Sequence, residues 1–297
     1  MTTAFRSLRL SLVLAPLAFN MAACGGGGGG GSFDNGGIFV NTMNATTVSY
    51  GRTMSVAVAG TGLDKGVRVT VDSGCGAVTE AAGGDAFTRR FTCRVTALGN
   101  LTIRAYNSGS LELARLQVTV PEPEVTMLLQ GADTANPTTL SSFTVKLDPQ
   151  LAPVSVNNFL DYVNAGFYRL TIFHRVVKDF VVQGGGYTAG PVIKPPTSPS
   201  IVLESKNGLR NTKGTIAMAR TSDPNSATSQ FYINTVDNPA LDYKSEADPG
   251  YAVFGSVISG LDVIEKLNAV PVRVDLLTGL THLPVSNVLV FSASQTK

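Results

Sequence analysis

Apolar residues alternate with small or polar ones through residues 33–120, in short runs separated by glycines. The clearest run places Met54, Val56 and Val58 at every second position. A period of two is that of a β-strand with one buried face. The same period recurs at residues 67–71, 91–95, 101–105 and 111–120. Short strands at this spacing predict an antiparallel β-sandwich.

Residues 125–297 combine strand patterns with helical ones. After Pro153, apolar residues recur at the spacing of one helix face until Gly166, and a second helix is expected at residues 261–267. Strands are expected at residues 125–129, 143–147, within 170–183, and at 215–219, 230–234, 253–258 and 288–292. Many strands with two helices predict a mainly β domain, a β-barrel capped by the helices.

Two prolines in the segment Pro121-Glu122-Pro123-Glu124 cannot continue a central strand. We therefore expect a short stiff hinge at residues 121–124, between a first domain of residues 33–120 and a second of residues 125–297. In the first domain, residues 58–63 (VAGTGL) weakly resemble bacterial immunoglobulin-like domains. That resemblance implies an immunoglobulin-like β-sandwich. Because no titratable residues cluster in it, we expect a spacer or adhesion module.

The first residues have the features of an export signal. Arg6 and Arg9 precede an apolar run, residues 10–19, that is too short to span a bilayer as a mature helix. The segment Met21-Ala22-Ala23-Cys24 then resembles the bacterial lipobox, in which the cysteine is lipidated and becomes the first mature residue. This resemblance implies a lipoprotein signal peptide at residues 1–23 and a lipid on Cys24. The alternative is an ordinary secretory signal cut near Ala23, with Cys24 as a bystander.

Seven glycines, residues 25–31, follow Cys24. Glycine runs form flexible coil and bury nothing, so residues 24–32 are expected to be a tether between the lipid anchor and the folded domains. In lipoproteins an Asp after the cysteine often retains the protein at the inner membrane, and this chain has Gly25 at that position. The resemblance therefore implies a lipid anchor in the outer membrane of a bacterial envelope, with the protein facing the periplasm.

Cysteine usage suits the same compartment. The chain has three cysteines, and with Cys24 lipidated, Cys75 and Cys93 remain. They are expected to form a disulfide in an oxidising periplasm. A loop of this length suggests roughly 3 kcal/mol of stabilisation in the chain-entropy description. Two buried free thiols are the alternative.

The charge balance excludes a strongly basic surface. Arg6 and Arg9 lie in the signal, so 21 of the 23 Lys and Arg residues remain against 21 Asp and Glu. A neutral balance provides no basic field to attract nucleic acid. His174 and His282 lie far apart, with no nearby carboxylate motif. We therefore expect no nucleic-acid partner, no metal and no cofactor, and a monomer.

The most informative segment of the chain is residues 173–186, FHRVVKDFVVQGGG. It sets Arg175, Phe180 and Gln183 into a strand-like apolar run that ends at three glycines. No cysteine, serine nucleophile or carboxylate pair accompanies them. Such a site can hold a peptide in an apolar pocket beside a fixed positive charge, but it is poorly equipped for covalent chemistry.

This segment resembles the core motif of cyclophilin-type peptidyl-prolyl isomerases. Four further segments match that family in order and spacing: residues 152–159 (APVSVNNF), 214–220 (GTIAMAR), 229–234 (SQFYIN) and 250–255 (GYAVFG). The resemblance covers the whole second domain and is greatest to bacterial periplasmic members. It implies a cyclophilin-like closed β-barrel capped by two helices.

The resemblance also implies roles for individual residues. Arg175 matches the family's catalytic arginine, whose permanently charged guanidinium donates to the substrate without proton transfer. An ion pair at the barrel rim is the alternative role for Arg175. The implied substrate-binding residues are Phe180, Val181, Gln183, Ala219, Arg220, Gln230, Tyr232 and Leu241. His174 is a candidate for a minor role, with packing as the alternative.

Two of these positions depart from the vertebrate pattern of the family. Val181 stands where Met is common, and Tyr232 stands where a pocket Phe is usual. The Tyr232 hydroxyl is therefore expected at a rim that is otherwise apolar.

The expected function is that of a peptidyl-prolyl cis-trans isomerase. It would rotate X–Pro bonds in unfolded or extended periplasmic polypeptides and so assist folding, with proline-containing chains as its partners. The alternative is a chaperone-like surface module that binds proline-containing peptides without catalysis.

Overall fold

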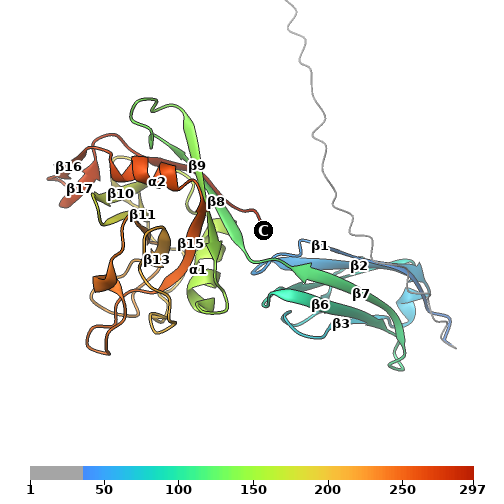
Figure 1. The fold of residues 1–297 in the computed structure, drawn as a ribbon. Coiled ribbons are helices and arrows are strands. Elements are labelled where there is room, and N and C mark those ends of the chain that lie inside the picture. The colour runs from blue at the N-terminus through green and yellow to red at the C-terminus, as the bar shows by residue number, and fades with distance from the viewer. Residues whose placement is uncertain (1–35) are drawn as a thin grey trace, which may run out of the picture.

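The structure is a computed structural model that describes residues 36–297. Figure 1 shows two bodies joined where strand β7 (Glu112–Val120) leads into strand β8 (Glu124–Gln130). The predicted signal peptide, the predicted lipidation site Cys24 and the predicted glycine tether all lie outside the described residues. Within the described part of the chain, no helix is both long and apolar enough to cross a membrane.

The first body consists of two antiparallel sheets. One has the order β1 (Phe39–Thr46), β2 (Thr53–Thr61), β5 (Thr88–Arg94) and β4 (Thr79–Glu80). The other has the order β3 (Arg68–Val71), β6 (Gly99–Tyr106) and β7. The alternating apolar residues of β2 and β6, such as Met54, Val56 and Ile103, are buried in one core. The period of two thus predicts these strands correctly, and the immunoglobulin-like assignment stays a prediction.

A disulfide joins Cys75 to Cys93 in this body, as the cysteine count predicts. Cys93 points from β5 into the core beside Phe91, and Cys75 pairs with Val95 through an isolated bridge. The two cysteines are separated by 18 residues, and their Cα atoms lie 5.8 Å apart. The bond therefore fastens the start of a loop that contains the short edge strand β4 to strand β5 of the same sheet.

Replacing Cys75 and Cys93 together by Ala should lower the free energy of unfolding of the first body by about 3 kcal/mol, because the unfolded chain regains the entropy of the open loop. Urea unfolding of the oxidised protein and of the double variant measures the difference. The second body is the internal control, since residues 125–297 contain no cysteine. An unchanged midpoint for the first body would show that the bond does not stabilise it.

The second body is a closed barrel of eight antiparallel strands. Around the barrel these strands are β10 (Thr171–Val177), β18 (Leu289–Gln295), β8, β9 (Leu140–Leu147), β15 (Val253–Ser259), β13 (Thr215–Met218), β14 (Phe231–Asn234) and β11 (Val181–Thr188). Pairing of β11 with β10 closes the ring, and the short strand β12 (Val192–Ile193) extends β11. Closure leaves no unpaired strand edge in the ring.

Two helices accompany the barrel, α1 (Pro153–Asn164) and α2 (Leu261–Asn268). Helix α1 starts at Pro153, as its sequence pattern predicts, and Phe159 lies within 5.5 Å of the ring centroids of Tyr168, Phe231 and Phe254. The carboxylate of Glu204 accepts hydrogen bonds from the backbone N–H groups of Val154 and Ser155 at 3.0 and 2.7 Å. A side chain distant in sequence therefore caps the free N–H groups of this helix.

The exposed side of α1 bears the contact between the two bodies. Asp161 forms an ion pair with Arg94 at 2.8 Å, and Asn164 accepts a hydrogen bond from Arg52 at 2.7 Å. Tyr50 is buried there, and its hydroxyl accepts a hydrogen bond from Asn157 at 3.3 Å. The two bodies are therefore joined by side-chain contacts as well as by residues 121–123.

The sequence pattern did not predict a hairpin that follows α2. It consists of β16 (Val272–Asp275) and β17 (Leu280–Pro284), and β17 lies against β10. In Figure 1 it projects from the barrel beside β10 and β11. Most of its residues are exposed, so it lacks the alternation of buried and exposed positions that reveals a strand.

Candidate functional site

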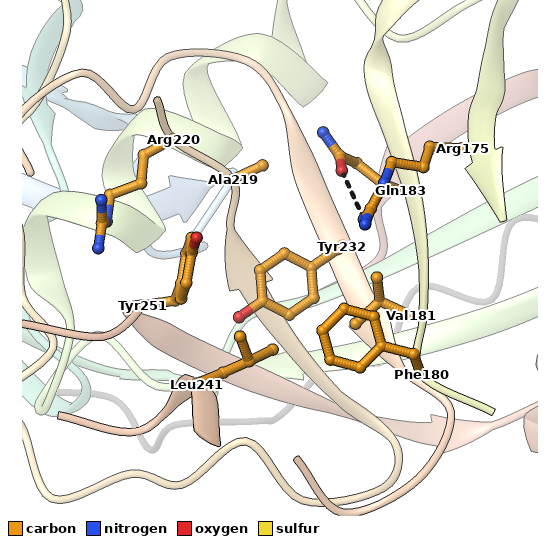
Figure 2. Close-up of a pocket in the computed structure, with 9 residues that line it drawn as sticks. All are labelled: Arg175, Phe180, Val181, Gln183, Ala219, Arg220, Tyr232, Leu241 and Tyr251. Carbon is orange, nitrogen blue, oxygen red and sulfur yellow. Dashed lines mark hydrogen bonds between the residues drawn. The ribbon is translucent and has the colours of Figure 1, made fainter. Parts of the chain in front are cut away.

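A pocket of about 230 Å³ opens on the surface of the barrel. Figure 2 shows its lining residues, which are Arg175, Phe180, Val181, Gln183, Ala219, Arg220, Tyr232, Leu241 and Tyr251. Eight of these nine residues were predicted from the sequence, and the structure brings all eight together. The ninth predicted residue, Gln230, lines an adjoining hollow together with Gln183 and Arg220.

The hairpin of β10 and β11 positions the polar side of the pocket. Arg175 pairs directly with Gln183, and Val177 pairs with Val181, so that each pair shares a face of the hairpin. Asp179 takes a positive φ of 56° in the connecting turn, which presents Phe180 beside the strands. Arg175 and Gln183, eight residues apart in the sequence, are therefore in direct contact.

The floor of the pocket is apolar. Val181 and Tyr232 are almost fully buried, and the half-buried side chains of Phe180 and Leu241 pack against them. Leu241 comes from a short 3-10 turn, Pro239–Leu241, that follows β14. These residues form a small apolar cluster separate from the main barrel core, and one side of that cluster remains open. Its chemistry suits a small apolar ring.

The polar rim is a short chain of hydrogen bonds. Arg175 Nη1 donates to Gln183 Oε1 at 3.4 Å, and Gln183 Nε2 donates to Gln230 Oε1 at 3.0 Å. Arg175 forms no ion pair with any residue in the described range 36–297. The ion pair that was the alternative role for Arg175 is therefore not found there. The guanidinium keeps donors free to point at a bound molecule.

Arg220 differs from Arg175 although both line the pocket. Its Nε and Nη2 donate to the Gly250 carbonyl oxygen at 3.1 and 2.8 Å, and its Nη1 donates to the Thr221 carbonyl oxygen at 2.9 Å. The guanidinium also lies 4.5 Å from the ring centroid of Tyr251. Its donors are thus engaged, and Arg220 forms a wall of the pocket rather than a free cation.

Sequence reasoning missed Tyr251 as a lining residue. The sequence feature that could have identified Tyr251 is the family-like segment at residues 250–255, in which Gly250 precedes the tyrosine. Gly250 adopts a φ of 60°, and a Cβ there would lie 2.5 Å from the Asp242 carbonyl carbon. A glycine at this point lets the loop pass close to residue 242 and directs Tyr251 toward Arg220.

The Tyr232 hydroxyl does not lie at an apolar rim as expected from the sequence. It donates to Asn211 Oδ1 at 2.7 Å, and Asn211 in turn donates from Nδ2 to Asp242 Oδ1 at 3.1 Å. Burial raises the pKa of Tyr232 above its usual value. The ring therefore presents its apolar face to the pocket, while a buried polar network satisfies the hydroxyl.

Tyr232→Phe should destabilise the protein by about 1 kcal/mol, because one buried hydrogen bond is lost while the ring remains. Asn211 Oδ1 keeps a second donor, Asn234 Nδ2 at 3.2 Å, which limits the cost. Thermal and urea unfolding measure the change. Tyr251→Phe is the matched control, since that hydroxyl forms no hydrogen bond with another described residue. A gain in stability for Tyr232→Phe would contradict the assignment.

His174 lies behind the pocket and does not line it. It is 2% exposed, its ring lies 4.5 Å from that of Tyr187, and its Nδ1 has no hydrogen-bond partner in the described structure. Burial lowers its pKa from 6.5 to about 4, partly opposed by the neighbouring Ile172 backbone and Gln230 side chain. The imidazole is therefore neutral at neutral pH, which favours packing, the alternative role for His174.

This lowered pKa predicts a pH dependence of stability. The unfolded chain binds a proton at His174 below pH 6.5, whereas the folded chain binds it only near pH 4. Stability should therefore be greatest above pH 6.5 and fall by about 2 kcal/mol between pH 7.5 and pH 5 from this residue. Urea unfolding at the two pH values measures the loss.

The matched variants for that experiment are His174→Phe and His282→Gln. The first should remove the His174 contribution, and the second should retain it because His282 lies elsewhere, on β17. An equal pH dependence in wild type and His174→Phe would show that His174 is not the group responsible.

Comparisons with known proteins agree with this geometry. The sequence profile of the family described as cyclophilin type peptidyl-prolyl cis-trans isomerase matches residues 134–293. The chain is 53% identical over 133 residues to peptidyl-prolyl cis-trans isomerase A of Dickeya dadantii, covering 45% of this chain and 69% of that protein. It is 49% identical over 128 residues to peptidyl-prolyl cis-trans isomerase B of Escherichia coli, covering 42% of this chain and 77% of that protein.

Among solved structures, a cyclophilin type peptidyl-prolyl cis-trans isomerase from Cryptosporidium parvum superposes with a TM-score of 0.46 and 22% sequence identity. The superposition covers 59% of this chain and 98% of that protein.

Proposed function

The chain belongs to the cyclophilin-type peptidyl-prolyl cis-trans isomerase family and is an isomerase of that kind, and we propose that its pocket rotates X–Pro bonds in unfolded or extended periplasmic polypeptides. This activity would assist the folding of exported proteins. The observation that carries the proposal is the guanidinium of Arg175 at the edge of an apolar pocket, where it has one long hydrogen bond to Gln183 and further donors available to a substrate.

The reaction requires stabilisation of a twisted amide. Rotation about the peptide bond breaks its resonance and crosses a barrier of about 18–20 kcal/mol. The uncatalysed exchange of an X–Pro bond is correspondingly slow. A catalyst accelerates the rotation only if it binds the twisted state more strongly than either planar state.

The pocket residues can meet that requirement without covalent chemistry. We place the proline ring on the apolar floor formed by Phe180, Tyr232 and Leu241. In the twisted state the proline nitrogen regains a lone pair and becomes an acceptor, to which Arg175 can donate. Gln183 fixes the guanidinium through their hydrogen bond and can also bind the substrate backbone. Because the charge of Arg175 is permanent, no step requires proton transfer.

The remaining predicted residues would hold the chain on either side of the proline. Ala219 directly follows β13, and its N–H donates to the Gln230 carbonyl oxygen. Gln230 orients Gln183, and Arg220 walls the pocket together with Tyr251. An extended segment can therefore lie along residues 219–220 with its proline in the pocket.

Arg175→Ala should reduce kcat/KM for a short Ala-Pro peptide about a hundredfold, equivalent to about 3 kcal/mol of transition-state stabilisation. The loss should fall mainly on kcat, and thermal stability should remain near that of wild type because Arg175 forms no ion pair with a described residue. Arg175→Lys should restore little activity, since an ammonium lacks the planar fork. A protease-coupled isomerisation assay and a thermal melt give both quantities.

A folded Arg175→Ala protein with near-normal turnover would defeat the catalytic role of Arg175. A wild type that binds the peptide without accelerating its isomerisation would favour the non-catalytic binding module instead. These two outcomes are distinct, because the first concerns one residue and the second the activity of the whole pocket.

For the location we propose a lipid anchor on Cys24 in the outer membrane of a bacterial envelope, with the isomerase facing the periplasm. The support is the basic and apolar signal pattern, the lipobox-like residues 21–24 and the glycine run that follows. The Cys75–Cys93 disulfide suits an oxidising compartment.

Cys24→Ala should abolish lipidation and release the protein from the membrane fraction, because no other cysteine occupies a lipobox-like position. Membrane fractionation and intact-mass analysis of the mature N-terminus measure the two effects. Cys75→Ala is the matched control and should leave the fractionation unchanged. An unlipidated wild-type protein in the soluble fraction would contradict the anchor.

A further inference from the structure

The hairpin of β16 and β17 carries two fully exposed leucines at its tip. Leu276 is 90% and Leu277 is 97% exposed. Single exposed apolar residues are ordinary, but here two adjacent leucines continue into the exposed residues Val272 and Val274 of the same hairpin. The hairpin therefore presents exposed apolar side chains at its tip and along β16.

The turn that bears these leucines is held by hydrogen bonds between its own residues. Asp275 is buried, and its Oδ2 accepts hydrogen bonds from Thr278 N at 3.2 Å and Thr278 Oγ1 at 2.6 Å. Gly279 N donates to the Asp275 carbonyl oxygen at 2.8 Å, and Gly279 has a φ of 74°. Because backbone and side-chain bonds hold the turn, the leucines are not required to close it.

A groove of about 380 Å³ lies between this hairpin and the hairpin of β10 and β11. Its lining includes Val176, Val177 and Lys178 on one side and Val270, Pro271 and Val272 on the other. After Lys178 the chain continues through Asp179 to Phe180 of the proline pocket, whose N–H donates to the Val177 carbonyl oxygen at 3.1 Å. The pocket and the groove therefore border the same turn of the chain, the groove at residues 176–178 and the pocket from residue 180, with no residue lining both.

This turn is fastened to α2. Asp179 N donates to Asn268 Oδ1 at 3.0 Å, and Asn268 Nδ2 donates to Asp179 Oδ1 at 3.3 Å. These reciprocal bonds hold the turn of the β10–β11 hairpin against the end of α2, the helix that precedes the β16–β17 hairpin. The groove is consequently a built feature of the barrel surface rather than a gap between loose loops.

We propose that this groove and the leucine tip bind the same unfolded polypeptide whose proline occupies the pocket, and that they favour apolar side chains a few residues away from that proline. Because the pocket and the groove border the same turn, an extended client that leaves the pocket over Phe180 can continue toward the groove. The proposal rests on the isomerase function proposed above and names its substrate class as apolar, unfolded chains.

The chemistry of the groove favours an unfolded peptide over a lipid surface as the bound partner. Its sides are apolar, and Lys178 at its edge forms no hydrogen bond or ion pair with another described residue. That ammonium can receive a backbone carbonyl or an acidic side chain of the client. The hollow behind the tip matches a narrow chain, whereas a flat bilayer surface would leave it unfilled.

The test compares two substrates with one pair of variants. One substrate is a blocked tetrapeptide containing Ala-Pro, and the other is a reduced, unfolded protein whose refolding is limited by prolyl isomerisation. In Leu276→Ser/Leu277→Ser, the ratio of kcat/KM for the protein to kcat/KM for the tetrapeptide should fall at least fivefold. Leu276→Met/Leu277→Met, which keeps the tip apolar, should restore the ratio.

Two further variants locate the effect. Val272→Ser changes the groove wall and should lower the same ratio. Phe87→Ser is the matched control, since Phe87 is 63% exposed on the first body, and it should leave the ratio unchanged.

The possible outcomes separate the proposals. An unchanged ratio in the leucine and Val272 variants would overturn the groove proposal, as would an equal fall for both substrates. Loss of binding to phosphatidylcholine vesicles without any change in the ratio would assign the tip to a lipid surface and overturn it too. A wild type that accelerates neither substrate would instead defeat the proposed function itself.

Discussion

The pairing of β10 with β11 is the contact on which the rest of the second body depends. It joins the two ends of the strand order and so turns an open sheet into a closed barrel. The same pairing sets Arg175 opposite Gln183 and holds the turn that presents Phe180. A slip of this register by one residue would move every side chain to the opposite face, so closure and site geometry are specified together.

Glycines at residues 184–186 allow strand β11 to lie close to β14 while it pairs with β10. A Cβ on Gly185, whose φ is 87°, would come within 2.7 Å of the Ser229 carbonyl oxygen. A Cβ on Gly186 would lie 2.5 Å from Gln230 Cδ. A side chain at residue 186 would displace Gln230, the residue that orients Gln183, and one at residue 185 would displace the backbone just before it. Gly185 and Gly186 therefore support the position of Gln183 beside Arg175 through close approach.

The two arginines of the pocket show how surroundings divide identical side chains between roles. Arg220 uses its donors on two backbone carbonyls and stacks on Tyr251, so it builds the wall. Arg175 has one long hydrogen bond to Gln183 and remains available to a substrate. His174 is kept neutral at neutral pH by burial. The guanidinium of Arg175 carries its charge permanently, so a rotation stabilised by it needs no proton transfer.

The sequence alone determined the features that depend on local pattern. The period of two predicted strands of the first body, Pro153 marked the start of α1, and the cysteine count predicted the disulfide. Ordered motifs identified eight residues that the structure places around one pocket. These predictions succeed because strand alternation, helix starts and family motifs are properties of neighbouring residues.

Tertiary structure alone decided the partners of these residues. Tyr251 became a wall through Arg220, 31 residues earlier in the chain, and the Tyr232 hydroxyl turned to Asn211 rather than to the pocket. The hairpin at residues 272–284 escaped prediction because its exposed residues show no buried face. The physical reason is the same in each case: a side chain's hydrogen-bond partner and its burial depend on segments that only folding brings beside it.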